Sequence, residues 1–155
     1  MRKLTIISFA LLACSGGMHA QLTNSGNLRT FAGANMTIYG DVTNNGLIAD
    51  SATLITLAGS NLQTFGGSSV TTLKNLRLNN SSVAGITLAQ ALNVRGTLTF
   101  TDGYLNTTAA NTLTFTPTAS VSGASTNSFV SGPAVKTGNT SFVFPSGKNG
   151  VYAPI

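Results

Sequence analysis

Short stretches in which apolar and polar residues alternate run through the chain, and residues that favour turns close each one. Leu98 and Phe100 alternate with threonine across residues 97–101, and the same pentapeptide returns at residues 112–116. A period of two places successive side chains on opposite faces of a β-strand, whereas no stretch keeps a helical period beyond one turn. Turn-forming sequences such as Asn-Ser-Gly, Asn-Asn-Gly and Asp-Gly separate the stretches. The pattern predicts an all-β chain of strands three to six residues long.

Internal repetition adds a second constraint. The pentapeptide Thr-Leu-Thr-Phe-Thr occurs twice, and Asn followed by Leu or Met recurs at residues 27–28, 35–36, 61–62 and 75–76. Such repeats predict a parallel β-solenoid (β-helix), in which each coil adds short strands to parallel sheets and packs its apolar side chains against the next coil. Asn at the turns favours the same fold, because stacked side-chain amides can hydrogen-bond from coil to coil. A β-sandwich of antiparallel sheets is the alternative for short strands at this spacing.

The chain carries few charges. Eight Lys and Arg and three Asp, with no Glu, make up 7% of the sequence, against about a quarter in an average domain. Gly, Ser, Thr and Asn supply 71 of the 155 residues. Uncharged Thr and Ser suit the outer face of a stacked sheet, because like charges directly opposite each other on neighbouring strands repel. Low charge, together with a hydrophobic share of 42%, also argues against a disordered chain.

Residues 1–20 resemble a secretory signal peptide. Two basic residues precede an apolar run over residues 4–13 that is too short to span a bilayer, and small residues follow it. Ala20 supplies the small side chain that signal peptidase requires before the bond it cuts. We therefore expect cleavage between Ala20 and Gln21.

The same leader also resembles a bacterial lipobox. Leu-Leu-Ala-Cys ends at Cys14, so lipidation of this cysteine is the alternative route of export. Either route predicts a protein that is secreted or held on the outer surface of a Gram-negative bacterium, with no transmembrane span.

The rest of the chain divides by composition into two parts. Residues 21–130 hold the alternating stretches and are predicted to form the solenoid, whereas residues 131–155 are richer in Gly and Pro. The second part is interpreted as a cap over the end of the solenoid or as the start of a following β module. Residues 152–155 resemble a strand that is just beginning, so we expect the sequence to be a fragment of a longer protein with further domains downstream.

Residues 21–155 contain no His, no Cys and no Glu. A Ser-His-Asp triad and a structural or catalytic zinc site are excluded on these grounds. Only Asp41, Asp50 and Asp102 remain for acid–base or calcium chemistry, and each is expected to serve a turn or a strand end, because Asp side chains accept hydrogen bonds from nearby backbone. The sequence therefore predicts no catalytic, cofactor-binding or metal-binding residue, and no enzyme in this segment.

The basic residues are scattered rather than clustered. Without the leader the net charge is +3, from three acidic and six basic residues. A nucleic-acid site needs cationic side chains gathered along a phosphate backbone, so nucleic acid is not expected as a partner. The basic residues are Arg29, Lys74, Arg77, Arg95, Lys136 and Lys148.

Several low-complexity motifs resemble a class of exported Bacteroidetes proteins. The motifs are Asn-Leu-Arg-Leu-Asn-Asn at 75–80, Leu-Asn-Val-Arg-Gly-Thr-Leu-Thr-Phe at 92–100, Ser-Phe-Val-Ser-Gly-Pro at 128–133, Phe-Pro-Ser-Gly-Lys at 144–148 and Tyr-Ala-Pro at 152–154. Members of the class are large secreted or surface-attached β-helical, adhesin-like repeat proteins, many with a C-terminal type IX secretion sorting domain. The resemblance implies a β-helix and an adhesive role, and it implies no catalytic residues.

We therefore expect a structural or adhesin-like protein that presents a Thr/Ser/Asn-rich solenoid face to glycans or cell-surface components. A carbohydrate-associated module of a larger secreted enzyme is the alternative. The repeated threonine pentapeptide raises ice binding as a third hypothesis, because regular outward Thr on a flat face can match an ice lattice. Tyr39, Tyr104 and Tyr152 are the aromatic residues that could stack on sugars if they are exposed.

Overall fold

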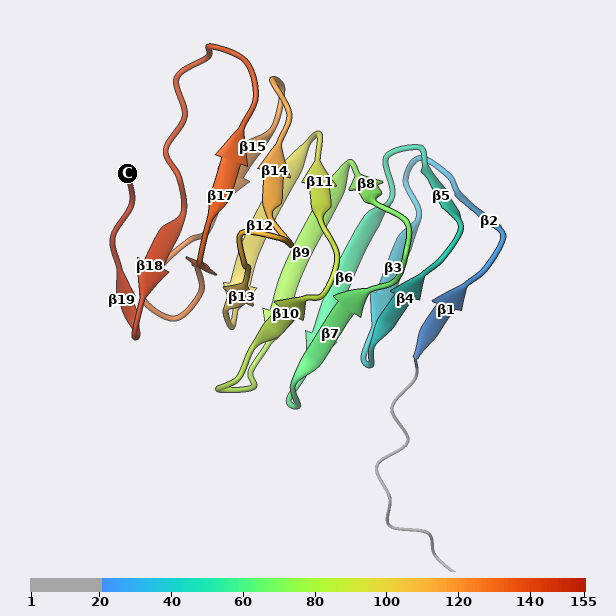
Figure 1. Ribbon diagram of the computed structural model, residues 1–155, viewed down its shortest axis with the longest axis horizontal. Coiled ribbons are helices and arrows are strands. Elements are labelled where there is room, and N and C mark those ends of the chain that lie inside the picture. The colour runs from blue at the N-terminus through green and yellow to red at the C-terminus, as the bar shows by residue number, and fades with distance from the viewer. Residues whose placement is uncertain (1–20) are drawn as a thin grey trace, which may run out of the picture.

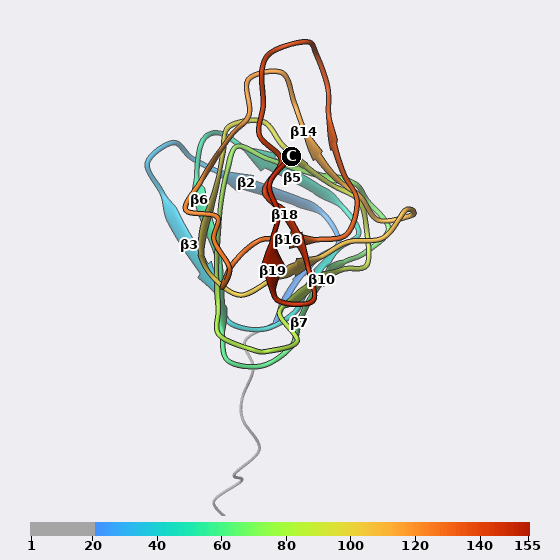
Figure 2. The same ribbon diagram turned by 90° about the vertical axis from the view of Figure 1, so that its left-hand side faces the viewer.

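The computed structural model describes residues 21–155, which form nineteen short strands and no helix. The strands wind in chain order into a parallel β-solenoid of about five coils, whose coils lie side by side in Figure 1 and superimpose around one axis in Figure 2. The predicted all-β solenoid is confirmed. The β-sandwich alternative is wrong, because the strands that pair between successive coils are parallel.

The first sheet begins each coil. It contains β1 (Leu22–Asn24), β4 (Val42–Asn44), β7 (Gln63–Gly66), β10 (Ile86–Leu88), β13 (Leu105–Asn106), β16 (Val130–Ser131), β18 (Ser146–Lys148) and β19 (Val151–Tyr152). These strands are parallel up to β18, which forms an antiparallel hairpin with β19. The spacing between coils is irregular: Ile86 pairs with Leu105, and Leu105 pairs with Val130. Loops of different length between the strands absorb this difference, as solenoids tolerate insertions at their corners.

Two further sheets complete the coil. The second sheet contains β8 (Thr71–Leu73), β11 (Leu92–Val94), β14 (Leu113–Phe115) and β17 (Ala134–Lys136), and in the first two coils a separate parallel pair, β2 (Asn27–Thr30) and β5 (Leu47–Asp50), precedes the third sheet. The third sheet contains β3 (Asn35–Ile38), β6 (Leu54–Gly59), β9 (Asn75–Asn80), β12 (Thr97–Asp102) and β15 (Ser120–Ser122). Its three central strands are six residues long, so it offers the widest outer face.

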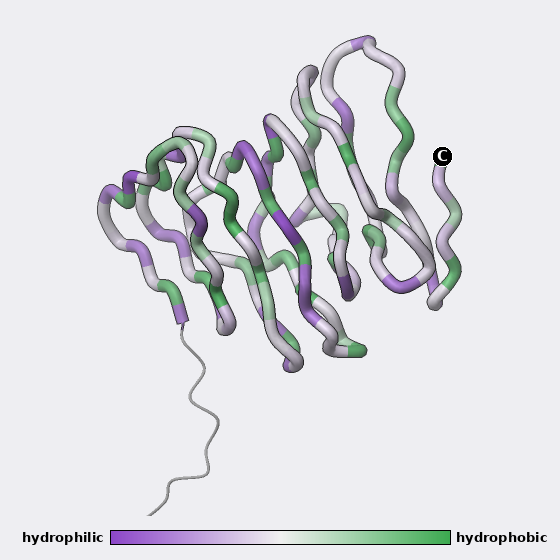
Figure 3. The backbone as a smooth tube through the Cα atoms, turned by 180° about the vertical axis from the view of Figure 1, so that it is seen from behind, coloured by the Kyte–Doolittle hydropathy of each residue, from purple (hydrophilic) through white to green (hydrophobic). Residues whose placement is uncertain are grey.

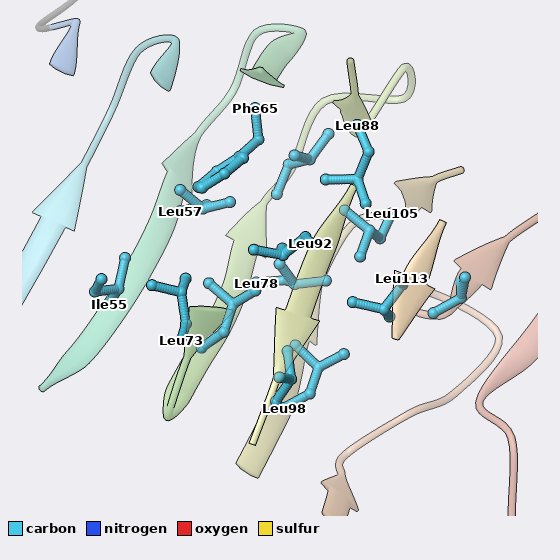
Figure 4. Packing of buried hydrophobic residues seen from close by; sticks show 14 of the residues in the cluster. Ile55, Leu57, Phe65, Leu73, Leu78, Leu88, Leu92, Leu98, Leu105 and Leu113 are labelled. Atoms are coloured by element: carbon cyan, nitrogen blue, oxygen red, sulfur yellow. The ribbon is translucent and has the colours of Figure 1, made fainter. Parts of the chain in front are cut away.

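The register of the sheets stacks apolar side chains into continuous columns inside the solenoid. Leu76 is fully buried and lies between Ile55 of the preceding coil and Leu98 of the following one. Figure 4 shows these layers, with side chains from all three sheets meeting in one core. Full burial of a Leu or Ile side chain stabilises a fold by about 1.5–3 kcal/mol, so the columns supply most of the stability of a chain without disulfides. Hydrophobic and hydrophilic stretches are interspersed along the coils (Figure 3).

The predicted amide ladder lies at the corner after the first sheet. Asn24 Nδ2 donates to Asn44 Oδ1 at 2.7 Å, and Asn44 Nδ2 donates to Thr71 Oγ1 at 2.8 Å, so the ladder links three coils. Each asparagine also accepts a hydrogen bond from the backbone N–H two residues ahead, at Gly26 and Gly46. The Asn-Xaa-Gly turns are therefore both local turns and connections between coils.

Aromatic side chains gather toward the last coils. Phe129 is buried and packs against Tyr104 with ring centroids 4.6 Å apart, and against Tyr152 at 6.4 Å. Phe115 packs against Phe142 at 4.8 Å. Residue 130 is the first residue of β16, and β17 and β18 extend the second and first sheets beyond it. The interpretation of residues 131–155 as a cap or as the start of a module stays a prediction.

The leader lies outside the described residues. The expected signal peptide at residues 1–20, with Cys14 and Ala20, is therefore not part of the structure described, which begins at Gln21. Gln21 is exposed and directly precedes β1. From residue 21 onward, no helix is long and apolar enough to cross a lipid bilayer.

Candidate binding groove on the third sheet

The outer face of the third sheet carries a row of polar side chains, one from each coil. The strand register aligns Thr37, Thr56, Arg77, Thr99 and Ser122. Ser122 Oγ donates to Thr99 Oγ1 at 3.3 Å, and the hydroxyls of Thr97 and Ser120 are 3.2 Å apart in the neighbouring row. The face is therefore rich in hydroxyl groups, and Arg77 is the one charged member of its row.

A groove of about 440 Å³ crosses the first three coils of this face. We name it the Tyr39–Arg77 groove. Its polar lining consists of Thr37, Tyr39, Thr56, Arg77, Asn79 and Ser81.

Small residues in the second coil create the groove. Ala58 and Gly59 complete its lining, and Ala58 pairs in register with Asn79 of the third coil. A Cβ at Gly59 would lie 3.4 Å from the carbonyl oxygen of Tyr39, which places the first coil directly on the other side. Thr56 and Ala58 are only 9% and 4% exposed although alternation with buried Ile55 and Leu57 turns them outward. The side chains of the flanking coils therefore stand above this low strip and form the groove walls.

Buried amides fix the end of the groove. Asn80, whose side chain is 1% exposed, donates to the carbonyl of Asn61 at 2.9 Å and accepts from the N–H of Ser82 at 2.9 Å. Gln63 donates to the carbonyls of Ile38 and Gly40. Because buried amides without partners would cost free energy, these bonds hold the corner between the third and first sheets in one conformation. The same hydrogen bonds hold the strand ends that carry Tyr39 and Ser81 in place beside the groove.

Only one of the three tyrosines offers an open ring. Tyr39 is 61% exposed and lines the groove. Tyr104 and Tyr152 are half-buried and pack on Phe129, so their rings belong to the aromatic cluster of the later coils. Of the three tyrosines, Tyr39 alone has the exposed ring that stacking on a sugar would require.

Arg77 differs from other basic residues in its surroundings. It is exposed, it lines the groove, and no carboxylate shares that lining. Arg95 donates instead to the carbonyl oxygen of Asp50, and Lys136 Nζ donates to the carbonyls of Thr116 and Pro117, each at 3.0 Å. The lining of the groove thus carries one positive charge among hydroxyl and amide groups.

The aspartates lie on separate elements. Asp50 Oδ1 accepts from the backbone N–H groups of Ala52 and Thr53 at 3.0 and 2.9 Å, and Asp41 Oδ1 accepts from the N–H of Thr64 at 2.7 Å. The predicted turn role of Asp50 is confirmed by these local bonds. Asp41 stands directly before β4, as predicted for a strand end, but its side chain bonds to the next coil rather than to nearby backbone.

Asp102 ends β12 where that strand shifts register against β9, and it pairs there with Asn79. Among residues 21–155, no group of three acidic, His or Cys side chains lies close enough to hold a metal ion.

The two threonine pentapeptides do not form one array. Residues 97–101 lie in β12 of the third sheet, whereas residues 112–116 surround β14 of the second sheet. Their outward threonines therefore project from different sides of the solenoid. The repeat that suggested the ice-binding hypothesis therefore forms two separate strands and not one continuous row of threonines.

Comparisons with known proteins do not assign the chain. No protein-family model matches it, and neither does a curated protein or a solved structure. The structure places the chain in a class of fold, the β-solenoid of stacked coils.

The groove was only partly foreseeable from the sequence. The sequence predicts Tyr39 as a residue that could stack on a sugar, and it predicts a strand near Leu76 with Arg77 outward, whereas Asn79 belongs only to the motif of the resemblance. Alternation with Leu76 and Leu78 places Arg77 and Asn79 on the same outer face, since side chains alternate along a strand. The strand register between coils decides that Arg77 and Asn79 line the same groove as Tyr39, which lies two coils earlier.

Proposed function

We propose that this chain is a secreted or cell-surface, adhesin-like structural protein that binds glycans on the outer face of its third sheet. The segment performs no catalysis in this proposal, and its work is attachment. Export through the leader and presentation outside a Gram-negative cell, in the manner of the β-helical adhesins that the sequence resembles, form part of the same proposal.

The observation that carries this proposal is the composition of the Tyr39–Arg77 groove. An exposed tyrosine ring offers an apolar surface with a polar tip, which suits the C–H face of a sugar ring. Hydroxyl, amide and guanidinium groups stand beside it and can exchange hydrogen bonds with sugar hydroxyls. One aromatic platform among several hydrogen-bonding groups suits a sugar, which offers both C–H faces and hydroxyl groups.

The scaffold supports this role. The groove is carried by strands whose register and corner amides are fixed before a ligand arrives. Binding to a preformed site loses less conformational freedom than ordering a mobile loop does, so more of the interaction energy appears as affinity. Repeated coils also present similar polar rows along the solenoid, which suits a polymeric ligand.

A glycan array with the purified chain tests the proposal. We expect binding to a subset of glycans that Tyr39→Ala weakens by roughly two- to tenfold, which corresponds to the about 0.5–1.5 kcal/mol typical of aromatic contacts. Phe31→Ala is the matched control, because Phe31 is 69% exposed and does not line the groove. An absence of binding to every glycan overturns the proposal, and equal effects of the two substitutions place the binding surface elsewhere.

A further inference from the structure

We propose that the Tyr39–Arg77 groove selects saccharides that carry a carboxylate, such as oligomers of a uronic acid. The inference rests on the proposed function and narrows it from glycans in general to acidic ones. It is drawn from the position of a single cation in a groove that contains no acid.

The guanidinium of Arg77 is suited to a carboxylate. Its planar fork of N–H donors can form two parallel hydrogen bonds to the two oxygens of one carboxylate, and such charge-assisted bonds are stronger than neutral ones. The neighbours of Arg77 across the sheet are Thr56 and Thr99, whose side chains carry no charge. An incoming carboxylate would therefore meet one unopposed cation.

The two acidic residues nearest the groove lie outside its lining. Asp41 follows the coil end that bears Tyr39, and its Oδ1 accepts from the backbone N–H of Thr64. Asp102 pairs with Asn79 from the coil beyond Arg77. Neither carboxylate lines the groove. Asp41 lines an adjoining hollow that shares Tyr39, so the positive charge of the groove is located at its Arg77 end.

The separation of the two anchors matches an oligosaccharide rather than a single sugar. Tyr39 follows β3 and Arg77 belongs to β9, with β6 between them in the sheet. Neighbouring strands lie about 4.8 Å apart, so the two anchors are separated by roughly 10 Å along the solenoid. One sugar ring can therefore lie on Tyr39 while the carboxylate of an adjoining ring reaches Arg77.

Titration calorimetry with galacturonic acid oligomers tests this inference, with neutral galactose oligomers of the same length as the comparison ligand. We expect the acidic oligomer to bind more tightly to the purified chain. Arg77→Gln should lower that affinity by roughly 10- to 100-fold, the range expected for a hydrogen bond to a charged group, and should lower the affinity for the neutral oligomer much less, because the glutamine amide can still hydrogen-bond a sugar hydroxyl. Arg77→Lys should retain part of the preference, because it keeps the charge and loses the fork.

Arg29→Gln is the matched control, since Arg29 is also exposed but lies on β2, outside the groove. It should leave both affinities unchanged. A salt series on the unmodified chain gives a second readout: the acidic oligomer should bind more weakly as ionic strength rises, because exposed charges are screened. Unchanged circular dichroism spectra of the variants establish that they are folded.

The outcomes separate the two proposals. Equal affinity for acidic and neutral oligomers, or equal effects of the Arg77 and Arg29 substitutions, overturns the carboxylate inference while glycan binding stands. Tighter binding of sulfated galactose oligomers than of galacturonic acid oligomers overturns the assignment to carboxylates. Failure to bind any of these oligomers or any glycan on the array contradicts the proposed function itself.

Discussion

The backbone of Gly103 lies so close to the carbonyl of Asn80 in the preceding coil that a Cβ at Gly103 would stand 2.0 Å from that oxygen. Gly103 also has φ +83°, a conformation that L-residues with side chains rarely adopt. Two separate requirements therefore act at this position: a left-handed backbone and the contact between coils.

Substitution Gly103→Ala should lower the free energy of unfolding through both requirements. The left-handed backbone costs about 1–2 kcal/mol, and forcing a methyl group against a packed backbone adds about 1–3 kcal/mol. Gly33→Ala is the control, because Gly33 has φ +80° and open space around its would-be Cβ. Urea unfolding should show a clearly larger loss for Gly103→Ala. Equal losses for the two variants would mean that the close approach of the coils at Gly103 adds nothing to the cost of the substitution.

The amide ladder leads to a second prediction. Asn44→Ala removes the acceptor of Asn24 Nδ2 and the donor to Thr71 Oγ1, and both partners are buried. Asn24 Nδ2 keeps its bond to the carbonyl of Leu47, whereas the buried Thr71 Oγ1 loses its partner, which should cost about 1–3 kcal/mol. Asn45→Ala should change stability by no more than about 0.5 kcal/mol, because its hydrogen bonds to Ser68 are exposed. Thermal unfolding followed by circular dichroism measures both, and similar midpoints for the two variants would count against a stabilising ladder.

A third prediction concerns the apolar column. Leu76→Ala should lower the free energy of unfolding by about 2–5 kcal/mol, because it opens a cavity between Ile55 and Leu98. Val83→Ala removes apolar atoms from a side chain that is 95% exposed and should have almost no effect. Denaturant titrations of both variants provide the test. A small effect of Leu76→Ala would indicate that the coils are loosely packed.

The position of the threonine pentapeptides predicts that the purified chain shows no thermal hysteresis. The outward row of the third sheet is interrupted by Arg77, and that of the second sheet contains Asn93 between Thr72 and Thr114. Neither row is the continuous series of threonine hydroxyls that matching an ice lattice requires. Measurement of freezing and melting points in a nanolitre osmometer would detect the activity, and a clear gap between the two points would revive the ice-binding hypothesis.

The fold could be predicted because its physical causes are local. Alternation around Leu98 and Leu113 identifies strands, and the turn residues between strands limit their length. Low charge and repeated Asn then favour stacking in parallel. The ladder from Asn24 to Asn44 shows that the asparagines at the turns serve the coil-to-coil role expected of them.

The arrangement between coils could not be predicted, because register is set by packing across the whole coil. Two identical pentapeptides lie in different sheets, since the loop lengths between strands decide which strand meets which. Tyr39 and Arg77 line one groove only because the strands between residues 35 and 80 align as they do. The small residues Ala58 and Gly59, which open the groove, carry no signal of their own in the sequence.

The most direct test of glycan binding at the third sheet is a nuclear magnetic resonance titration of the isotope-labelled chain with the glycan that binds most tightly on the array and, in parallel, with a galacturonic acid oligomer. We expect progressive shifts of the backbone amides of Thr37, Thr56 and Arg77, with those of Thr72 and Thr114 on the second sheet unchanged. Shifts confined to the second sheet, or an absence of shifts with both ligands at saturation, would contradict glycan binding at the third sheet.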